Sequence, residues 1–402
     1  MSAVFRSLRL LPTPSSFSSS LILPVSYRTR AFGKPNRSLR WSETTLGKSD
    51  LFVSKRARCS GGGARSADVR CVAPKDGRVV GVPDARYTGI ECLLMMFLRD
   101  HFSFIEDVAA ARAPESLNHL LNMLQARGEA LISPAAKEGL IPLVIPLSEN
   151  PSGKLTSLLR WPTSPPGMEM PVVEVHKHGV WLLAKSVDQY IHRMLVEEDA
   201  NVENTSKLWD ASAEAGQKLY KKADLSESGI ADLDIYLLKK VGLFPDVIER
   251  KISRHLETGD QVSAMITGEF YTKQHFPGFG RPFAFNAQIL LKVGRNLEAK
   301  DAARGALKSP WWTLGFKYQD VADIAEWEDE QIEYIKEKIT EEGRMEDLKK
   351  GKAPEQAALD EAAFLMDLAS IDGSWNEVVD RIAECYMEAG LHDIAKFIAF
   401  RE

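Results

Sequence analysis

Two histidines close together are the first residues in this chain whose type and spacing could do chemistry. His176 and His178 stand two apart in a probable strand, so both imidazoles would face one side, as a pair of metal ligands requires. A zinc site needs three or four ligands, and the nearest further histidine is His192. We therefore expect exposed hairpin histidines here rather than a metal site.

Carboxylates are abundant further along, from Glu326 to Glu333 and at Glu341-Glu342, but no nucleophile or histidine accompanies them. A solvated helix face is the simpler interpretation. The alternative is a docking face for a basic partner, which would speed association and weaken with salt. We place that face on Glu328, Asp329, Glu330 and Glu333.

Two aromatic segments are distinctive. The stretch from Phe276 to Phe283 places two glycines between aromatic rings, followed by Arg281. It predicts either a rigid connection between helices or a docking loop that exposes Arg281 to a partner. Trp311-Trp312 follows Pro310 and indicates core packing or a docking surface, with an aromatic ligand platform as the weaker alternative.

No motif specifies a reaction. Gly61-Gly62-Gly63 lacks the Lys-Ser/Thr of a phosphate loop. Cys92 and Cys385, the two cysteines after residue 71, are too far apart in sequence for a disulfide framework or metal cluster, and we expect buried free thiols. We predict no catalytic, cofactor-binding or metal-binding residues, and no cofactor. This favours a binding or assembly protein over an enzyme.

Residues 1–71 differ in charge from the rest. They hold 13 of the 51 basic residues but only three of the 56 acidic ones, so the remainder carries a net charge of −15. An Arg- and Ser-rich, acid-poor opening is typical of an organelle transit peptide. Its length and the Val69-Arg70-Cys71 sequence favour a chloroplast, although an amphipathic helix from Val4 leaves a mitochondrial address open.

The acidic balance after residue 71 disfavours general nucleic-acid binding, because phosphate contacts need Lys and Arg. The longest apolar runs, Cys92 to Leu98 and Leu140 to Leu147, fall far short of the ~20 residues that cross a bilayer. We expect no membrane span and a protein partner.

After a flexible start at 72–84, residues 85–200 predict a small mixed α/β domain. A helix with leucines at helical spacing runs from Leu117 to a stop at Gly128, and a hairpin turns around Lys177-His178-Gly179. Eight prolines between Ser133 and Pro171 predict extended, turning loop in between. A helix from Val187 to Glu197 closes this part.

Residues 201–402 predict an all-helical domain, so the fold class is mainly α. Isoleucines at helical spacing indicate a helix over Glu328–Glu342 that stops at Gly343. Pro354 fits the first turn of another helix, and Ser374 with Glu377 has the spacing of a capping box. Gly390 separates the last two helices.

Several strings resemble a plant family named "protein in chloroplast ATPase biogenesis", also described under a cyclin-delta label. They are Trp161-Pro162-Thr163, Gly278-Phe279-Gly280-Arg281-Pro282, Ser309-Pro310-Trp311-Trp312-Thr313, and the tail from Ala325-Glu326-Trp327 through Leu391. The resemblance implies a stromal, non-enzymatic factor that aids assembly of the ATP synthase catalytic head, with the gamma subunit as partner. It carries over no catalytic residues.

Two other classes of function stay open. One is a plastid enzyme whose pocket lies between the mixed and helical parts and uses His176, His178 and the Arg281 loop. Convergent buried polar groups around a pocket would favour it. The other is a helical RNA-binding factor, which would need a basic stripe on an otherwise acidic chain.

Overall fold

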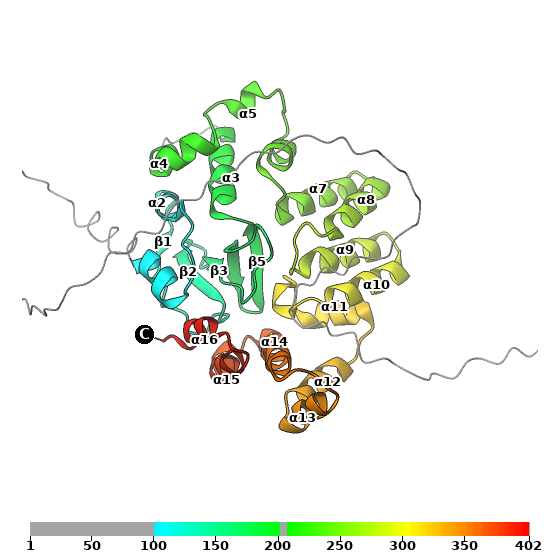
Figure 1. Ribbon diagram of the computed structural model, residues 1–402. Helices are drawn as coiled ribbons and strands as arrows, with labels where there is room; N and C mark the ends of the chain where they lie inside the picture. Colours follow the sequence, from blue (N-terminus) through cyan, green and yellow to red (C-terminus); the bar gives the residue numbers. More distant parts are fainter. Residues whose placement is uncertain (1–99, 202–206, 402) are drawn as a thin grey trace, which may run out of the picture. The chain divides into compact units, whose positions relative to one another are not determined.

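The computed structural model describes residues 100–201 and 207–401. Those residues form a small antiparallel sheet surrounded and followed by helices, which confirms the predicted mainly α class (Figure 1). The predicted transit peptide (1–71), the flexible start (72–84) and Cys92 lie outside the described residues. The domain boundaries at 200 and 201 stay a proposal.

The mixed part is built on a five-stranded meander in the order β1-β2-β3-β4-β5, with every neighbouring pair antiparallel. Its elements are η1 (Phe104–Val108), α2 (Leu117–Ala126), β1 (Ala130–Leu131), β2 (Val144–Glu149), β3 (Leu155–Leu159), β4 (Val172–His176), β5 (Gly179–Ala184) and α3 (Val187–Ala200).

The prediction of loop throughout the proline-rich stretch was wrong, because β2 and β3 both lie within it. Pro146 lies inside β2, beside the point where the pairing with β3 shifts register between Pro146 and Ser148. A proline, which cannot donate to the ladder, is tolerated at such an irregularity. The apolar run around Leu147 is therefore a buried strand.

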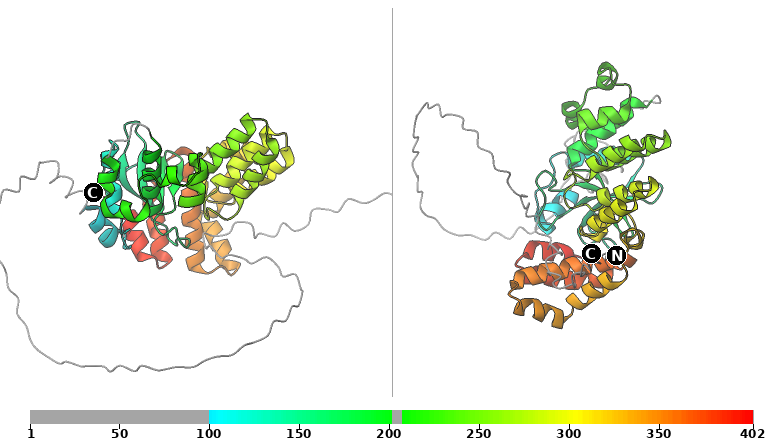
Figure 2. Two further views of the ribbon diagram at one scale, coloured as in Figure 1. Left: turned by 90° about the horizontal axis from the view of Figure 1, so that it is seen from above. Right: turned by 90° about the vertical axis from the view of Figure 1, so that its right-hand side faces the viewer.

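The helical part runs to the C-terminal end of the described chain. Its elements are α4 (Lys207–Leu219), α5 (Asp224–Glu227), α6 (Leu233–Tyr236), η2 (Leu237–Val241), α7 (Pro245–Glu257), α8 (Gln261–Thr272), α9 (Arg281–Lys292), α10 (Asn296–Ala306), η3 (Trp311–Thr313), α11 (Tyr318–Ala325), α12 (Glu330–Lys338), α13 (Glu341–Lys349), α14 (Pro354–Asp372), α15 (Trp375–Glu388) and α16 (His392–Ala399). From α7 to α10 each helix packs on the next, and α14, α15 and α16 do the same (Figure 2).

Several predicted helix ends are confirmed. The leucine-rich helix ends just before Gly128, which has a left-handed φ of 90°. The helix predicted from Val187 begins there, capped by the Ser186 side chain, which accepts from the Gln189 amide. Pro354 occupies the first turn of α14, and Gly390 follows the end of α15.

Two predictions about the ends of helices were wrong. The helix predicted over Glu328–Glu342 is interrupted, because Thr340 caps a new helix by accepting from the Gly343 amide at 3.1 Å. Gly343 is thus inside α13, where a Cβ would lie 2.3 Å from the Glu337 carbonyl oxygen. Ser374 does precede α15, but its side chain makes no capping hydrogen bond.

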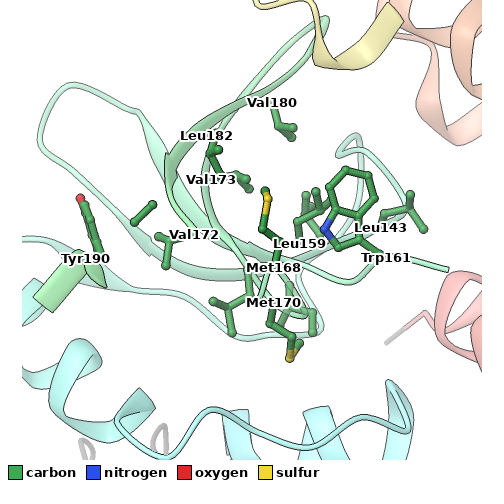
Figure 3. Packing of buried hydrophobic residues seen from close by; sticks show 14 of the residues in the cluster. Leu143, Leu159, Trp161, Met168, Met170, Val172, Val173, Val180, Leu182 and Tyr190 are labelled. Carbon is green, nitrogen blue, oxygen red and sulfur yellow. The ribbon is translucent and has the colours of Figure 1, made fainter. Parts of the chain in front are cut away.

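The sheet carries much of the main core. Figure 3 shows Trp161, at 1% exposure, among aliphatic side chains of the strands and the loop before β4. The ring centroids of Trp161 lie 5.8 Å from Trp312 and 5.7 Å from Phe279, which belong to the helical part. The core of the sheet therefore continues into the helices. A smaller second cluster gathers around Trp311 and Tyr318.

The tip of the β4–β5 hairpin connects the sheet to two distant helical segments. The indole N–H of Trp375 donates to the Lys177 carbonyl at 3.0 Å, and His178 Nδ1 donates to the Ser370 carbonyl at 3.0 Å. Gly179 packs so tightly on Trp312 that a Cβ would lie 1.9 Å from the Trp312 carbonyl oxygen. The tip thus contacts η3, α14 and the start of α15.

Asp367 on α14 makes a further link to η3. Its Oδ1 accepts from the Trp311 amide at 2.7 Å. Burial raises the pKa of Asp367 to about 8, because a charged carboxylate is poorly solvated there. The predicted packing role of Trp311-Trp312 is confirmed, since both side chains are buried.

None of the helices in the described residues combines the length and the apolar character that a bilayer crossing requires.

Replacing Gly179 with alanine tests the hairpin contact. We expect Gly179→Ala to lower the free energy of unfolding by about 3 kcal/mol or more, since backbone must move to admit the methyl group. Gly139→Ala is the matched control, because its φ is also positive but no atom lies within 4 Å of a Cβ. The Gly139→Ala control should lower the free energy of unfolding by about 1 kcal/mol. Equal losses in urea titrations would contradict the close contact.

A pH series on Asp367→Asn tests the buried carboxyl. The folded protein keeps the Asp367 proton up to about pH 8, whereas the unfolded chain releases it near its ordinary pKa of about 4. Wild-type stability should therefore fall relative to the variant by up to about 1.4 kcal/mol per pH unit between these values. Below about pH 4 the difference between the two should stay constant. Parallel stability curves would contradict the raised pKa.

Candidate functional site

The predicted acidic residues lie on the surface at the start of α12. Glu328, Asp329, Glu330 and Glu333 are all exposed. The apolar side of α12 fixes this orientation, because Ile335 is buried and Ile332 packs against the second cluster. The acidic side chains must then point outward.

A shallow hollow of about 610 Å³ lies along this acidic surface. Glu330, Glu333, Tyr334, Lys336, Glu337 and Thr340 line it. Positions 330, 333, 334 and 337 fall on one side of a helix. The predicted acidic residues, which end at Glu333, therefore cover only part of this surface. Helical spacing continued past Glu333 would have included Tyr334, which is 37% exposed, and Glu337. We call Glu328, Asp329, Glu330, Glu333, Tyr334 and Glu337 the acidic face.

Few of these charges are neutralised within the protein. Glu333 pairs with Lys336 at 3.0 Å. Among the described residues, no ion pair involves Glu328, Asp329, Glu330 or Glu337. The nearby Lys338 is directed instead toward Glu346 and Asp347 of α13. The acidic face can therefore attract a basic group from outside.

Arg281 is not exposed, so the docking-loop prediction was wrong. Its side chain is 13% exposed and forms a two-bonded pair with Glu249, with both N–O distances at 2.7 Å. It also donates to the Gly315 carbonyl and lies over the Trp181 ring. Although burial opposes the charged guanidinium, its hydrogen bonds to Glu249 raise the pKa of Arg281. The alternative, a rigid connection between helices, is confirmed.

The two hairpin histidines do not share a site. His176 stacks on Trp181, with ring centroids 4.2 Å apart, and its Nε2 lies 2.8 Å from Glu174 Oε1. His178 is directed to α14 instead. Both are half-buried, so the expected exposure was wrong. Within residues 100–201 and 207–401, no group of three or more His, Cys, Asp or Glu side chains could hold a metal ion.

A cleft of about 500 Å³ between β5, α7 and α9 is where an enzyme pocket was considered. Trp181 and Arg281 line it, whereas His176, which stacks on Trp181, is not among its lining residues. Four charged groups of its lining form two ion pairs: Arg250 bonds Asp246 at 2.9 Å along α7, and Arg281 of α9 bonds Glu249 of α7 at 2.7 Å. Such mutual pairing satisfies these polar groups and does not present them to a substrate.

Cys385 is buried in α15, as predicted for a free thiol. Burial raises the pKa of its thiol to about 12, with nearby Glu361 acting in the same direction. A thiol that stays protonated is a poor nucleophile.

Three sequence models of one family match the chain in order. They are PAB N-terminal over residues 99–240, PAB middle domain over 245–328 and PAB C-terminal domain over 332–400. The acidic face spans the junction of the last two. A curated relative from Arabidopsis thaliana, "Protein IN CHLOROPLAST ATPASE BIOGENESIS, chloroplastic", is 65% identical over 303 residues, covering 75% of this chain and 91% of the relative. No solved structure matches the chain.

Breaking the Arg281–Glu249 pair tests its structural role. Arg281→Met should lower the free energy of unfolding by about 3–5 kcal/mol, because Glu249 would remain buried without its cation. Adding Glu249→Gln should recover part of the loss. Arg295→Met is the control, since Arg295 is 51% exposed, and should cost less than about 1 kcal/mol. A loss that small for Arg281→Met in urea titrations would contradict the buried pair.

Proposed function

This chain belongs to the PAB family, and from that premise we propose that it is a non-enzymatic factor in the biogenesis of the chloroplast ATP synthase. The observation that carries the proposal is 65% identity across 91% of a relative named for chloroplast ATPase biogenesis. Identity at this level over nearly the whole relative supports a shared role. The same name supports a chloroplast address, which agrees with the transit-peptide composition of residues 1–71.

The finer proposal is that the protein works in the stroma on the catalytic head, with the gamma subunit as its partner. The acidic face supports a protein-binding role, because unneutralised carboxylates around Tyr334 suit a helix or segment rich in Lys and Arg. The Tyr334 ring lies among these acids, with the protein's own Lys338 Nζ 5.7 Å from its centroid. The paired charges of the cleft at Arg281 argue against the enzyme alternative.

Charge reversal on the acidic face tests this proposal. We expect a variant with Lys at Glu328, Asp329, Glu330 and Glu333 to bind purified gamma subunit at least about tenfold more weakly, because attraction becomes repulsion. Wild-type binding should also weaken as salt rises. The melting temperature should fall by no more than about 2–4 °C, since these side chains are exposed.

The control carries the same change in net charge without concentrating it on one face. Its four substitutions to Lys are at exposed acids on other elements: Asp188, Glu214, Asp301 and Glu377. It should bind like the wild type. If both variants bind normally across a salt series, the acidic face is not the docking site. If the wild type itself captures no ATP synthase head subunit, the assembly role fails.

A further inference from the structure

A second surface on the protein is apolar rather than acidic. Val262, Ile266 and Phe270 are 62%, 63% and 38% exposed and follow one another at four-residue spacing along α8. Residues four apart are neighbours on a helix, so these three form one continuous stripe. Its length is about 12 Å, from eight residues at about 1.5 Å each. We call these residues the α8 stripe.

The packing of α8 on its neighbouring helices does not use this stripe, although the Phe270 ring also stacks on His275 just after the helix, with ring centroids 4.3 Å apart. The helix is held against α7 and α9 by its opposite side, where Ala264, Gly268 and Tyr271 are buried. Gly268 lies so close to α9 that a Cβ would be 2.3 Å from Asn286 Oδ1. Polar residues at 262, 266 and 270 would leave those contacts intact.

Two more leucines are exposed on the next two helices. Leu291 is near the end of α9 and Leu297 near the start of α10, and they are 41% and 80% exposed. The Arg295 side chain, between these helices, reaches Met265 Sδ at 4.0 Å, which places this corner beside α8. The exposed fractions of the five side chains correspond to roughly 500 Å² of apolar surface. This total is within the range of about 300–600 Å² for the largest apolar patch on a monomer, and such a patch is often functional.

We propose that the α8 stripe, with Leu291 and Leu297, binds a single amphipathic helix of a protein partner. The size of the surface favours this occupant, because a stable dimer buries about 800 Å² per subunit. Apolar side chains at four-residue spacing form a ridge that fits the groove of a helix crossing at about −50°. The proposal concerns a surface other than the acidic face and does not depend on which protein the partner is.

Fluorescence anisotropy with the full chain tests the proposal. The probe is a labelled peptide of about 18 residues made of Leu, Lys and Glu, with leucines on one side of the helix. An isomer with the same composition and dispersed leucines is the reference. We expect the amphipathic peptide to bind at least about tenfold more tightly. Because apolar contact dominates, raising salt from about 0.1 M to about 0.5 M should change its affinity less than twofold.

Substitutions at Ile266 and at a matched site give the decisive comparison. Ile266→Glu, and separately Val262→Gln, should remove the preference for the amphipathic peptide without changing the melting temperature. Met387→Glu, at a 47% exposed side chain on α15, should retain it. Equal binding of both peptides to the wild type, or an unchanged preference in Ile266→Glu, would overturn the proposal. Sedimentation could instead show that the wild type is a dimer and that Ile266→Glu is a monomer. That result would overturn the proposal and would indicate that the stripe binds a second copy of this chain.

Discussion

The turn between β4 and β5 is the constraint on which the rest of the described structure depends. A three-residue tip at Lys177, His178 and Gly179 contacts segments about 130 to 200 positions later in the chain. Backbone carbonyls and buried indole rings make these contacts. Even a small displacement of the hairpin tip would therefore reduce the free energy of unfolding. The sheet is therefore a rigid base for the helices that follow it in the chain. The exposed side chains of α8 and of α12 each have a defined place on their own helix.

Charges inside and outside this framework behave differently. In the interior, Arg281 and Glu249 satisfy each other, and burial suppresses the reactivity of Cys385. Around the start of α12, Glu328, Asp329 and Glu330 face solvent and form no ion pair among the described residues, and on α8 apolar side chains are exposed. This distribution supports the proposed binding role, because an enzyme site typically gathers perturbed polar groups in a recess.

Local signals in the sequence predicted local structure well. The leucine spacing and Gly128 predicted α2, and Pro354 predicted the start of α14. Each of these signals depends only on residues a few positions apart in the chain. The strands β2 and β3 were not predicted, because the many prolines indicated loop. These strands are stabilised by pairing with neighbouring strands, which a local pattern does not reveal. Arg281 was misplaced for the same reason: its partner Glu249 lies 32 residues earlier, which spacing cannot reveal. Exposure of the acidic run was predictable, and the spacing of the predicted helix could have extended the acidic face to Glu337.

The two proposed surfaces suit different stages of one binding event. Long-range attraction at the acidic face would orient a basic partner and raise its association rate, but it would contribute little to retention at cellular salt. Apolar contact on the α8 stripe acts only at short range and slows dissociation. Roughly 500 Å² of such surface is too small for a permanent complex. Rapid capture with modest retention would suit the proposed role in biogenesis, in which the protein would release the subunit that it helps to assemble.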